Sequence, residues 1–245
     1  MRRNDKADSG LSCGRTILLS ENRPVRDLTA LARVRAVEPR LPPGTSTGTE
    51  LRILLESMRL FAHHGYRATS VRTIATAVGI KAPSLYEHFP AKEDILARIV
   101  LIGHRALLTA CERALADCGP DPVSQVRELV RTHVLNHVSY PLLAIVTNDE
   151  LHHLSPARAA EALTLRERTE HIAIEAGRRG VDQGLFDGTE LVATTAAISS
   201  MGVRAPYWFT PTPEYGPADL ANAYAELAVR MLRPGSPRGH ADRGA

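Results

Sequence analysis

The sequence predicts an all-α protein, and three observations support this fold class. Aromatic residues make up only 4% of the 245 residues, which is low for a β-sandwich or a β-barrel. Apolar residues after the first 46 positions recur three and four residues apart, the spacing of one face of an α-helix. No segment has the alternating pattern of a convincing strand. No stretch approaches the roughly 18 consecutive apolar residues of a membrane span, so no membrane association is expected.

A basic, disordered arm is expected before the helices. Residues 1–46 show no sustained periodicity and are rich in Arg, Pro, Gly, Ser and Thr. The sequence leaves open whether this arm has a function or results from an over-extended start site. No apolar segment precedes Cys13 as an export signal would require. The three cysteines are too few for a disulfide framework, so a cytoplasmic location is expected.

The ordered part of the chain is expected to begin at Thr47. Thr47 and Glu50 have the spacing of a capping box, in which each side chain bonds to the backbone of the other residue. Apolar residues at helical spacing follow, and Gly65 is expected to end this first helix.

Two short helices come next and predict a helix-turn-helix. The first begins at Ser70 and ends at Gly79, and the second has Pro83 in its first turn and stops before Pro90. A Gly-containing turn between two short helices is typical of this motif. Its small core is expected to contain Val71, Ile74, Ala75, Val78, Ile80 and Leu85.

Charge is distributed unevenly along the chain. Residues 49–92 carry six basic and three acidic side chains, whereas residues 93–245 carry 15 basic and 19 acidic ones. A basic module on an acidic body is typical of a nucleic-acid-binding protein with a separate sensing or dimerising domain. The excess is small, so charge alone favours this interpretation only slightly.

A longer motif overlaps the predicted helix-turn-helix. It reads Phe61-Ala62-x-x-Gly65-Tyr66-x-x-Thr69-Ser70-Val71-x-x-Ile74-Ala75-x-x-x-Gly79-Ile80-x-x-x-Ser84-Leu85-Tyr86-x-His88-Phe89-x-x-Lys92-Glu93-x-Ile95-Leu96. With its flanks, about residues 50–97, it resembles the DNA-binding domain of the tetracycline-repressor (TetR) family. The resemblance implies a homodimeric, all-helical regulator of transcription. Its third helix would enter the major groove of a palindromic operator in double-stranded DNA, and its larger C-terminal domain would bind an effector.

The resemblance also implies a set of DNA-facing residues. They are Ser70, Arg72, Lys81, Ala82, Pro83, Ser84, Tyr86, His88 and Lys92. Ser70, Tyr86 and Lys92 are expected to contact phosphates. Lys81, Ala82 and Ser84 are better placed for base edges or thymine methyl groups.

The remainder of the chain is also predicted to be helical. Helices are expected at residues 91–118, 122–138, 141–153, 156–184, 189–202 and 218–232. The predicted organisation is therefore an arm (1–46), a helix-turn-helix domain (47–95), an effector-binding and dimerisation domain (96–233) and a disordered tail (234–245).

The C-terminal part suits a mostly apolar effector. The segments Asn148–Pro156 and Arg204–Phe209 resemble the regulatory domain of a TetR subgroup that senses acyl-CoA esters from fatty-acid or steroid breakdown. An apolar helical domain with scattered polar groups fits such a ligand, and arginines would attract the phosphates of coenzyme A. The candidate effector-binding residues are Asn136, His137, Asn148, Arg178, Arg204 and Trp208.

Other interpretations stay open at this point. A regulator of an efflux or detoxification gene would bind a hydrophobic, drug-like molecule in the same place, and an architectural DNA-binding protein would bind no effector. The polarity of regulation is likewise open, with repression the expected form. No nucleophile elbow and no Gly-rich phosphate loop is found, so no enzymatic activity and no cofactor are expected. His133 and His137 have the spacing of two metal ligands but lack a companion ligand, so a structural or cavity-lining role is expected and no metal site.

The last two helices are expected to form the homodimer interface. Each has a face of small residues that lets helices approach closely in a four-helix bundle. The alternative is that these faces belong to the core of a single chain. The faces consist of Ala193, Ala196 and Ala197 in residues 189–202, and of Ala221, Ala225 and Ala228 in residues 218–232.

Overall fold

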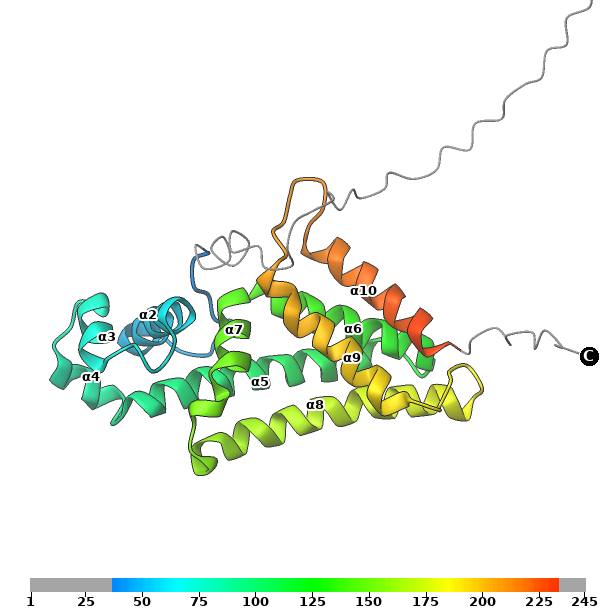
Figure 1. The fold of residues 1–245 in the computed structure, drawn as a ribbon, viewed down its shortest axis with the longest axis horizontal. Helices are drawn as coiled ribbons and strands as arrows, with labels where there is room; N and C mark the ends of the chain where they lie inside the picture. The colour runs from blue at the N-terminus through cyan, green and yellow to red at the C-terminus, as the bar shows by residue number, and fades with distance from the viewer. Residues whose placement is uncertain (1–36, 234–245) are drawn as a thin grey trace, which may run out of the picture.

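The computed structural model describes residues 37–233. Within this range the chain forms α-helices and short 3-10 helices, with an isolated β-bridge between Thr212 and Tyr215 (Figure 1). The predicted all-α fold class is therefore confirmed. The tail predicted for residues 234–245 and most of the predicted arm lie outside the described residues. No helix between residues 37 and 233 is long and apolar enough to cross a membrane.

Three helices form one end of the molecule, at the left of Figure 1. They are α2 (Gly48–His64), α3 (Val71–Val78) and α4 (Ala82–His88). The chain turns at Gly65 and Gly79, whose φ angles of 83° and 77° are positive and therefore favour glycine. The predicted glycine stops and the predicted helix-turn-helix are thus present.

The capping box predicted at the start of α2 is wrong. Thr47 is the N-cap residue, but its side chain makes no capping hydrogen bond. Glu50 instead lies 3.5 Å from the guanidinium of Arg98, which is on α5 (Lys92–Asp117). The helix begins where predicted, and tertiary packing directs Glu50 towards α5 instead of towards its own N-terminus.

Four helices make up the centre of the molecule. They are α5, α6 (Pro122–Ser139), α7 (Pro141–Asp149) and α8 (Pro156–Asp182). α5 leaves the helix-turn-helix and runs along the long axis with α8 beside it, and it also packs on α6 and α7 (Figure 1). The predicted boundary between residues 95 and 96 falls inside α5, so one continuous helix joins the two predicted domains.

The helix predicted for residues 141–153 is shorter than expected. α7 ends at Asp149, and a 3-10 turn, Leu151–His153, follows before α8 begins. This turn brings the chain back towards α5.

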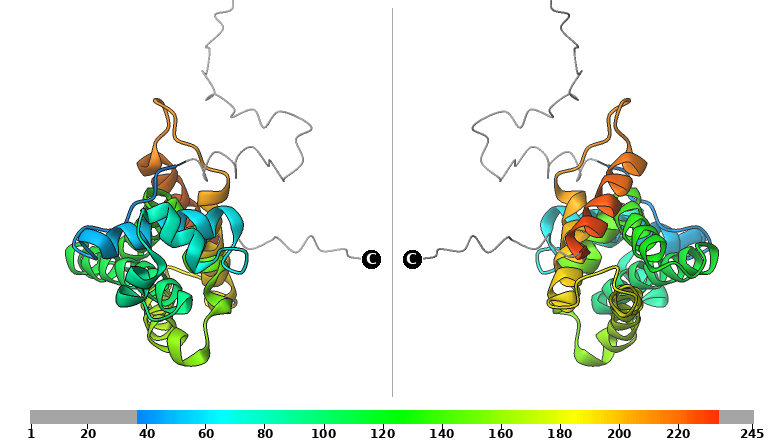
Figure 2. Two further views of the ribbon diagram at one scale, coloured as in Figure 1. Left: turned by 90° about the vertical axis from the view of Figure 1, so that its left-hand side faces the viewer. Right: turned by 90° about the vertical axis from the view of Figure 1, so that its right-hand side faces the viewer.

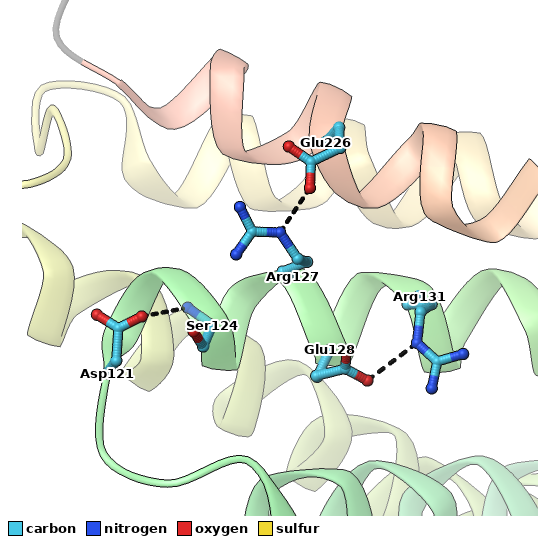
Figure 3. A network of polar contacts seen from close by, with 6 residues as sticks. All are labelled: Asp121, Ser124, Arg127, Glu128, Arg131 and Glu226. Carbon is cyan, nitrogen blue, oxygen red and sulfur yellow. Dashed lines mark hydrogen bonds and ion pairs between the residues drawn. The ribbon is translucent and has the colours of Figure 1, made fainter.

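The last two helices, α9 (Leu191–Arg204) and α10 (Pro217–Leu232), complete the fold. α10 packs along α6 and lies on the opposite side of the body from α8 (Figures 1 and 2). An ion pair closes the contact between α6 and α10, because Arg127 donates from Nε to Glu226 Oε1 at 2.5 Å (Figure 3). Asp121 caps α6 by accepting the N–H of Ser124 at 2.8 Å (Figure 3).

The small residues of α10 do not form an exposed face, contrary to the prediction that they belong to the homodimer interface. Ala221, Ala225 and Ala228 are at most 1% exposed, because α10 turns this face towards α6 and the core of its own chain. The small residues of α9 differ, since Ala193, Ala196 and Ala197 are exposed. Of the two small-residue faces, only that of α9 is exposed in residues 37–233.

Candidate DNA-binding surface and ligand cavity

The helix-turn-helix is held by local hydrogen bonds and an apolar core. Ser70 caps α3 by accepting the N–H of Thr73 at 3.0 Å. At the other end of α3, Gly79 adopts the left-handed conformation and Ile80 N donates to Ala75 O at 3.0 Å. Leu85 on α4 is completely buried. These contacts fix the orientation of α4 relative to α3.

Most of the predicted DNA-facing residues lie on the solvent side of this motif. Arg72, Lys81, Pro83 and His88 are exposed, as is Ser70, the N-cap of α3. Tyr86 has 49% of its surface exposed, so its ring and hydroxyl are accessible to a ligand. Ala82 and Ser84 are half-buried at the start of α4. The motif therefore presents a polar and aromatic surface opposite Leu85.

Lys92 lies apart from this surface and makes contacts within the chain. Its ammonium donates to the carbonyl oxygens of Tyr66 at 2.7 Å and Thr69 at 2.8 Å. It also lies 4.0 Å from the centre of the Tyr66 ring. Burial lowers the pKa of Lys92. The structure thus gives Lys92 the task of holding the turn that precedes α3.

The same turn contacts the rest of the molecule. The Tyr66 ring stacks on His153 with centroids 5.4 Å apart. Glu150, which follows α7, lies 3.3 Å from the ring of His153. At the start of α8, the N–H of Ser155 donates to Glu93 on α5 at 2.7 Å. The end of α7 and the start of α8 are therefore in direct contact with the helix-turn-helix.

A cavity of about 510 Å³ lies between α5, α6, α7, α8 and α9. This volume is in the range of small-molecule sites. Four of the six predicted effector-binding residues line it, namely Asn136, His137, Asn148 and Arg204.

Arg178 and Trp208 do not line this cavity. Arg178 is on the outer face of α8, where it pairs with Glu175 at 2.6 Å. Trp208 is half-exposed in the loop after α9, with its ring edge-on to Phe209. Linear sequence does not reveal which side of a helix or loop faces a cavity, and tertiary packing turns both residues outward.

Several cavity residues were not singled out from the sequence. They include His104, Thr147, Arg166 and Glu170. A signal existed for His104, because it is four residues from both Val100 and Leu108 and so continues the apolar face of α5. Thr147 carried no comparable signal, since nothing in the sequence indicates that α7 lies against α5 there.

Three histidines with lowered pKa values line the cavity, and two of them, His104 and His137, are buried. Burial lowers the pKa of His104 to about 4 and that of His133 to about 3, and it also lowers the pKa of His137. The His133 and His137 rings lie 4.4 Å apart. Among residues 37–233, no cluster of three His, Cys, Asp or Glu side chains has the geometry of a metal site. The three imidazoles are therefore neutral hydrogen-bonding groups at pH 7.

Comparisons with known proteins agree with this geometry. The profile described as "Bacterial regulatory proteins, tetR family" matches residues 53–99, and the profile "Tetracyclin repressor-like, C-terminal domain" matches residues 119–232. The HTH-type transcriptional repressor KstR2 of Rhodococcus jostii is 31% identical over 197 residues, covering 78% of this chain and 96% of the repressor.

Solved structures share the fold. A bacterial regulatory protein of the tetR family from Rhodococcus RHA1 has a TM-score of 0.71 and 30% identity, and the match covers 78% of this chain and all of that one. AibR, solved in complex with isovaleryl coenzyme A and operator DNA, has a TM-score of 0.66 and 23% identity, with 77% of this chain and all of that one covered. Proteins of this family regulate transcription and are not enzymes. The chain belongs to the TetR family of transcriptional regulators and is similar to the repressor KstR2.

Proposed function

We propose that this protein is a repressor that binds a palindromic operator as a homodimer and leaves it when an apolar effector occupies the cavity. The observation that carries the proposal is the exposed polar face of α4, on a helix whose other side is anchored by the fully buried Leu85. A helix held in this way suits insertion into the major groove. In this function residues 47–95 form the DNA-binding domain and residues 96–233 form the effector-binding and dimerisation domain. The protein would act in the cytoplasm, with the chromosome.

The proposed contacts divide into positioning and reading. Ser70 and Tyr86 would contact phosphates, because a hydroxyl on each side of the motif can donate to the DNA backbone. Lys81, Ala82 and Ser84 are at the start of α4, the part of a recognition helix that reaches base edges. The remaining members of the surface, Arg72, Pro83 and His88, would border these contacts, and Lys92 would act through the turn that it holds.

The homodimer would form through α9. Its exposed face carries Ala193 and Ala197, which do not line the cavity. Small side chains allow two helices to approach closely. Two copies related by a two-fold axis would place the α4 helices about one DNA turn apart, which is the reason for expecting a palindrome.

An acyl-CoA thioester is the effector class that we favour. The cavity volume suits an acyl group, and Arg204 lines the cavity as a candidate partner for a phosphate group. The structural neighbour AibR was solved with isovaleryl coenzyme A, which supports the same class here. A drug-like apolar ligand is the alternative, and the experiment below separates the two.

Release of DNA needs a path from the cavity to α4. α7 provides one, because Thr147 and Asn148 line the cavity while Glu150, immediately after α7, contacts His153. His153 in turn stacks on Tyr66. A ligand that shifts α7 would therefore shift the turn before α3 and change the separation of the two α4 helices.

The test is binding of the full chain to DNA from upstream of its own gene at two salt concentrations. Arg72→Ala should weaken binding and lower the salt dependence by about one counterion. Arg178→Ala removes the same charge far from α4 and serves as the matched control. Tyr86→Ala should also weaken binding. DNA binding that is unchanged in both Arg72→Ala and Tyr86→Ala would overturn the proposal. Absence of DNA binding by the unaltered protein at both salt concentrations would also overturn it.

The second part of the test identifies the effector with the same DNA-binding assay. Acyl-CoA esters of increasing chain length and a set of hydrophobic drugs would be added to the complex with DNA. Release by a thioester supports the favoured class, and release by a drug alone supports the alternative. If no compound that binds the protein alters its DNA affinity, control by an effector is refuted.

A further inference from the structure

We propose that one wall of the cavity binds a neutral oxygen function, a hydroxyl or a carbonyl group, on the buried end of an otherwise apolar effector. This wall, which we call the polar wall, consists of His104, His133, His137 and Thr147. The inference rests on the proposed function, because it assigns the part of the effector that the cavity recognises.

Two side-chain atoms of the polar wall are buried without a hydrogen-bond partner among residues 37–233. They are Nε2 of His104, whose residue is 7% exposed, and Oγ1 of Thr147, whose residue is 4% exposed. Buried polar atoms normally have partners, and an exception beside a cavity indicates that a bound molecule supplies one. Thr147 Oγ1 lies against the α5 backbone at Gly103, where a Cβ atom would overlap it. Thr147 therefore lies where α7 meets α5, at the residue that precedes His104 in the chain.

Backbone contacts fix the tautomers of the other two histidines. His133 Nε2 lies 3.1 Å from Ser199 O, and His137 Nδ1 lies 2.8 Å from His133 O. A carbonyl oxygen only accepts, so each of these ring nitrogens carries the hydrogen. Because burial lowers the pKa of both rings, they are neutral at pH 7. Their second nitrogens, His133 Nδ1 and His137 Nε2, are consequently hydrogen-bond acceptors.

This set of groups matches a neutral oxygen. A hydroxyl donates to an imidazole nitrogen and accepts from Thr147, whereas a carbonyl accepts from Thr147 or from a His104 N–H. A hydrocarbon end would leave all these groups unpaired. A carboxylate would meet two acceptor nitrogens and lose its hydration. Arg166 does not compensate such a charge, because it already pairs with Glu170 at 2.9 Å.

Calorimetric titration of the full chain without DNA tests the proposal. Four probes share the bicyclic decalin skeleton and carry a hydroxyl, a carbonyl, a carboxylate or only hydrogen. We expect the hydroxyl or the carbonyl probe to bind about tenfold more tightly than the hydrocarbon and the carboxylate. Equal affinity of the hydrocarbon, or saturable binding of none of the four, would overturn the inference.

Variants assign the effect to the polar wall. Thr147→Val keeps the shape of the side chain and removes a hydroxyl without a partner, so the preference should fall about tenfold while the Tm stays equal or rises. Thr195→Val is the matched control, because Thr195 lines the same cavity but its hydroxyl already donates to Leu191 O at 2.8 Å. His104→Phe tests the second unpartnered atom. A preference that survives in both Thr147→Val and His104→Phe contradicts the proposal.

The experiment distinguishes failure of the polar-wall inference from failure of the proposed function. Operator binding is measured on the same preparations. Loss of probe discrimination with intact operator binding overturns the polar wall alone, whereas absence of operator binding overturns the proposed function.

Discussion

Replacing Gly180 by alanine should destabilise the protein, although helix propensity alone predicts the reverse. Gly180 lies in the last turn of α8, and the chain then folds back so that Leu185 N donates to Gly180 O at 2.8 Å. This reversal places the ring of Phe186 on the backbone of Gly180. A Cβ at this position would overlap Cδ2 of Phe186 and lie 2.5 Å from Cε2. The ring has little room to move, because Phe186 is 4% exposed within a core cluster.

Two opposing contributions determine how much Gly180→Ala changes the free energy of unfolding. Glycine to alanine in a helix interior stabilises by about 1 kcal/mol. Overpacking of a well-packed core costs about 1–3 kcal/mol, and a direct overlap with a buried ring belongs at the upper end. The expected result for Gly180→Ala is therefore a net loss of about 2 kcal/mol in the free energy of unfolding.

Urea denaturation followed by far-UV circular dichroism measures this loss. All variants are compared at one protein concentration, because the stability of a dimer depends on it. The control is the same substitution in a Phe186→Ala background, where no ring opposes the new Cβ and the change should be neutral or stabilising. A Gly180→Ala chain as stable as the unaltered protein would refute the described packing of Phe186 on α8.

Four further predictions concern the core, the turn before α3, the dimer and pH. Leu85→Ala should cost about 2–5 kcal/mol of unfolding free energy and abolish DNA binding, and a denaturation midpoint equal to that of the unaltered chain would contradict the burial of Leu85. Lys92→Met leaves two carbonyl oxygens without their donor, so stability should fall by about 1 kcal/mol and operator affinity should fall with it; unchanged affinity in a gel-shift titration would show that Lys92 does not act on DNA binding. Ala197→Arg should yield a folded monomer in light scattering because this residue is exposed, whereas Ala225→Arg should prevent folding because that residue is 1% exposed; a dimeric Ala197→Arg chain would exclude the α9 interface. The pKa of His104 is lowered to about 4, so below about pH 6.5 the unfolded chain binds more protons than the folded chain, and the free energy of unfolding decreases as the pH decreases. His104→Phe should make this pH dependence shallower in urea titrations between about pH 7 and pH 5, and an identical slope would contradict the burial of this ring.

Local signals predicted the helices well. Glycines and prolines determine where a helix can start or stop through the backbone of single residues, and Gly65, Gly79 and Pro83 act in the structure as the sequence indicates. The apolar faces of α2, α3 and α4, represented by Leu54, Ile74 and Leu85, are likewise buried. These features depend on spacing within one helix, which the sequence contains in full.

Features that involve two helices were predicted less well. The spacing of Thr47 and Glu50 fits a capping box, yet Glu50 turns to Arg98, which is 48 positions away in the chain. The alanines of α10, represented by Ala225, have the small face of an interface helix, yet α6 of the same chain covers them. In each case the residues of a local pattern can make either of two contacts, and the position of a helix that is distant in the sequence decides which contact forms.

The sequence by itself determined the family motif, the order and approximate bounds of the helices, and the surface of α4, because each is set by neighbours along the chain. Only the tertiary structure decided which polar residues meet in a cavity. It brought His104 of α5, His137 of α6 and Thr147 of α7 to the same cavity and turned Arg178 and Trp208 outward. The physical reason is that a cavity is a property of how helices pack, and the relative rotation and separation of helices depend on the sum of many small contacts instead of on any one stretch of sequence.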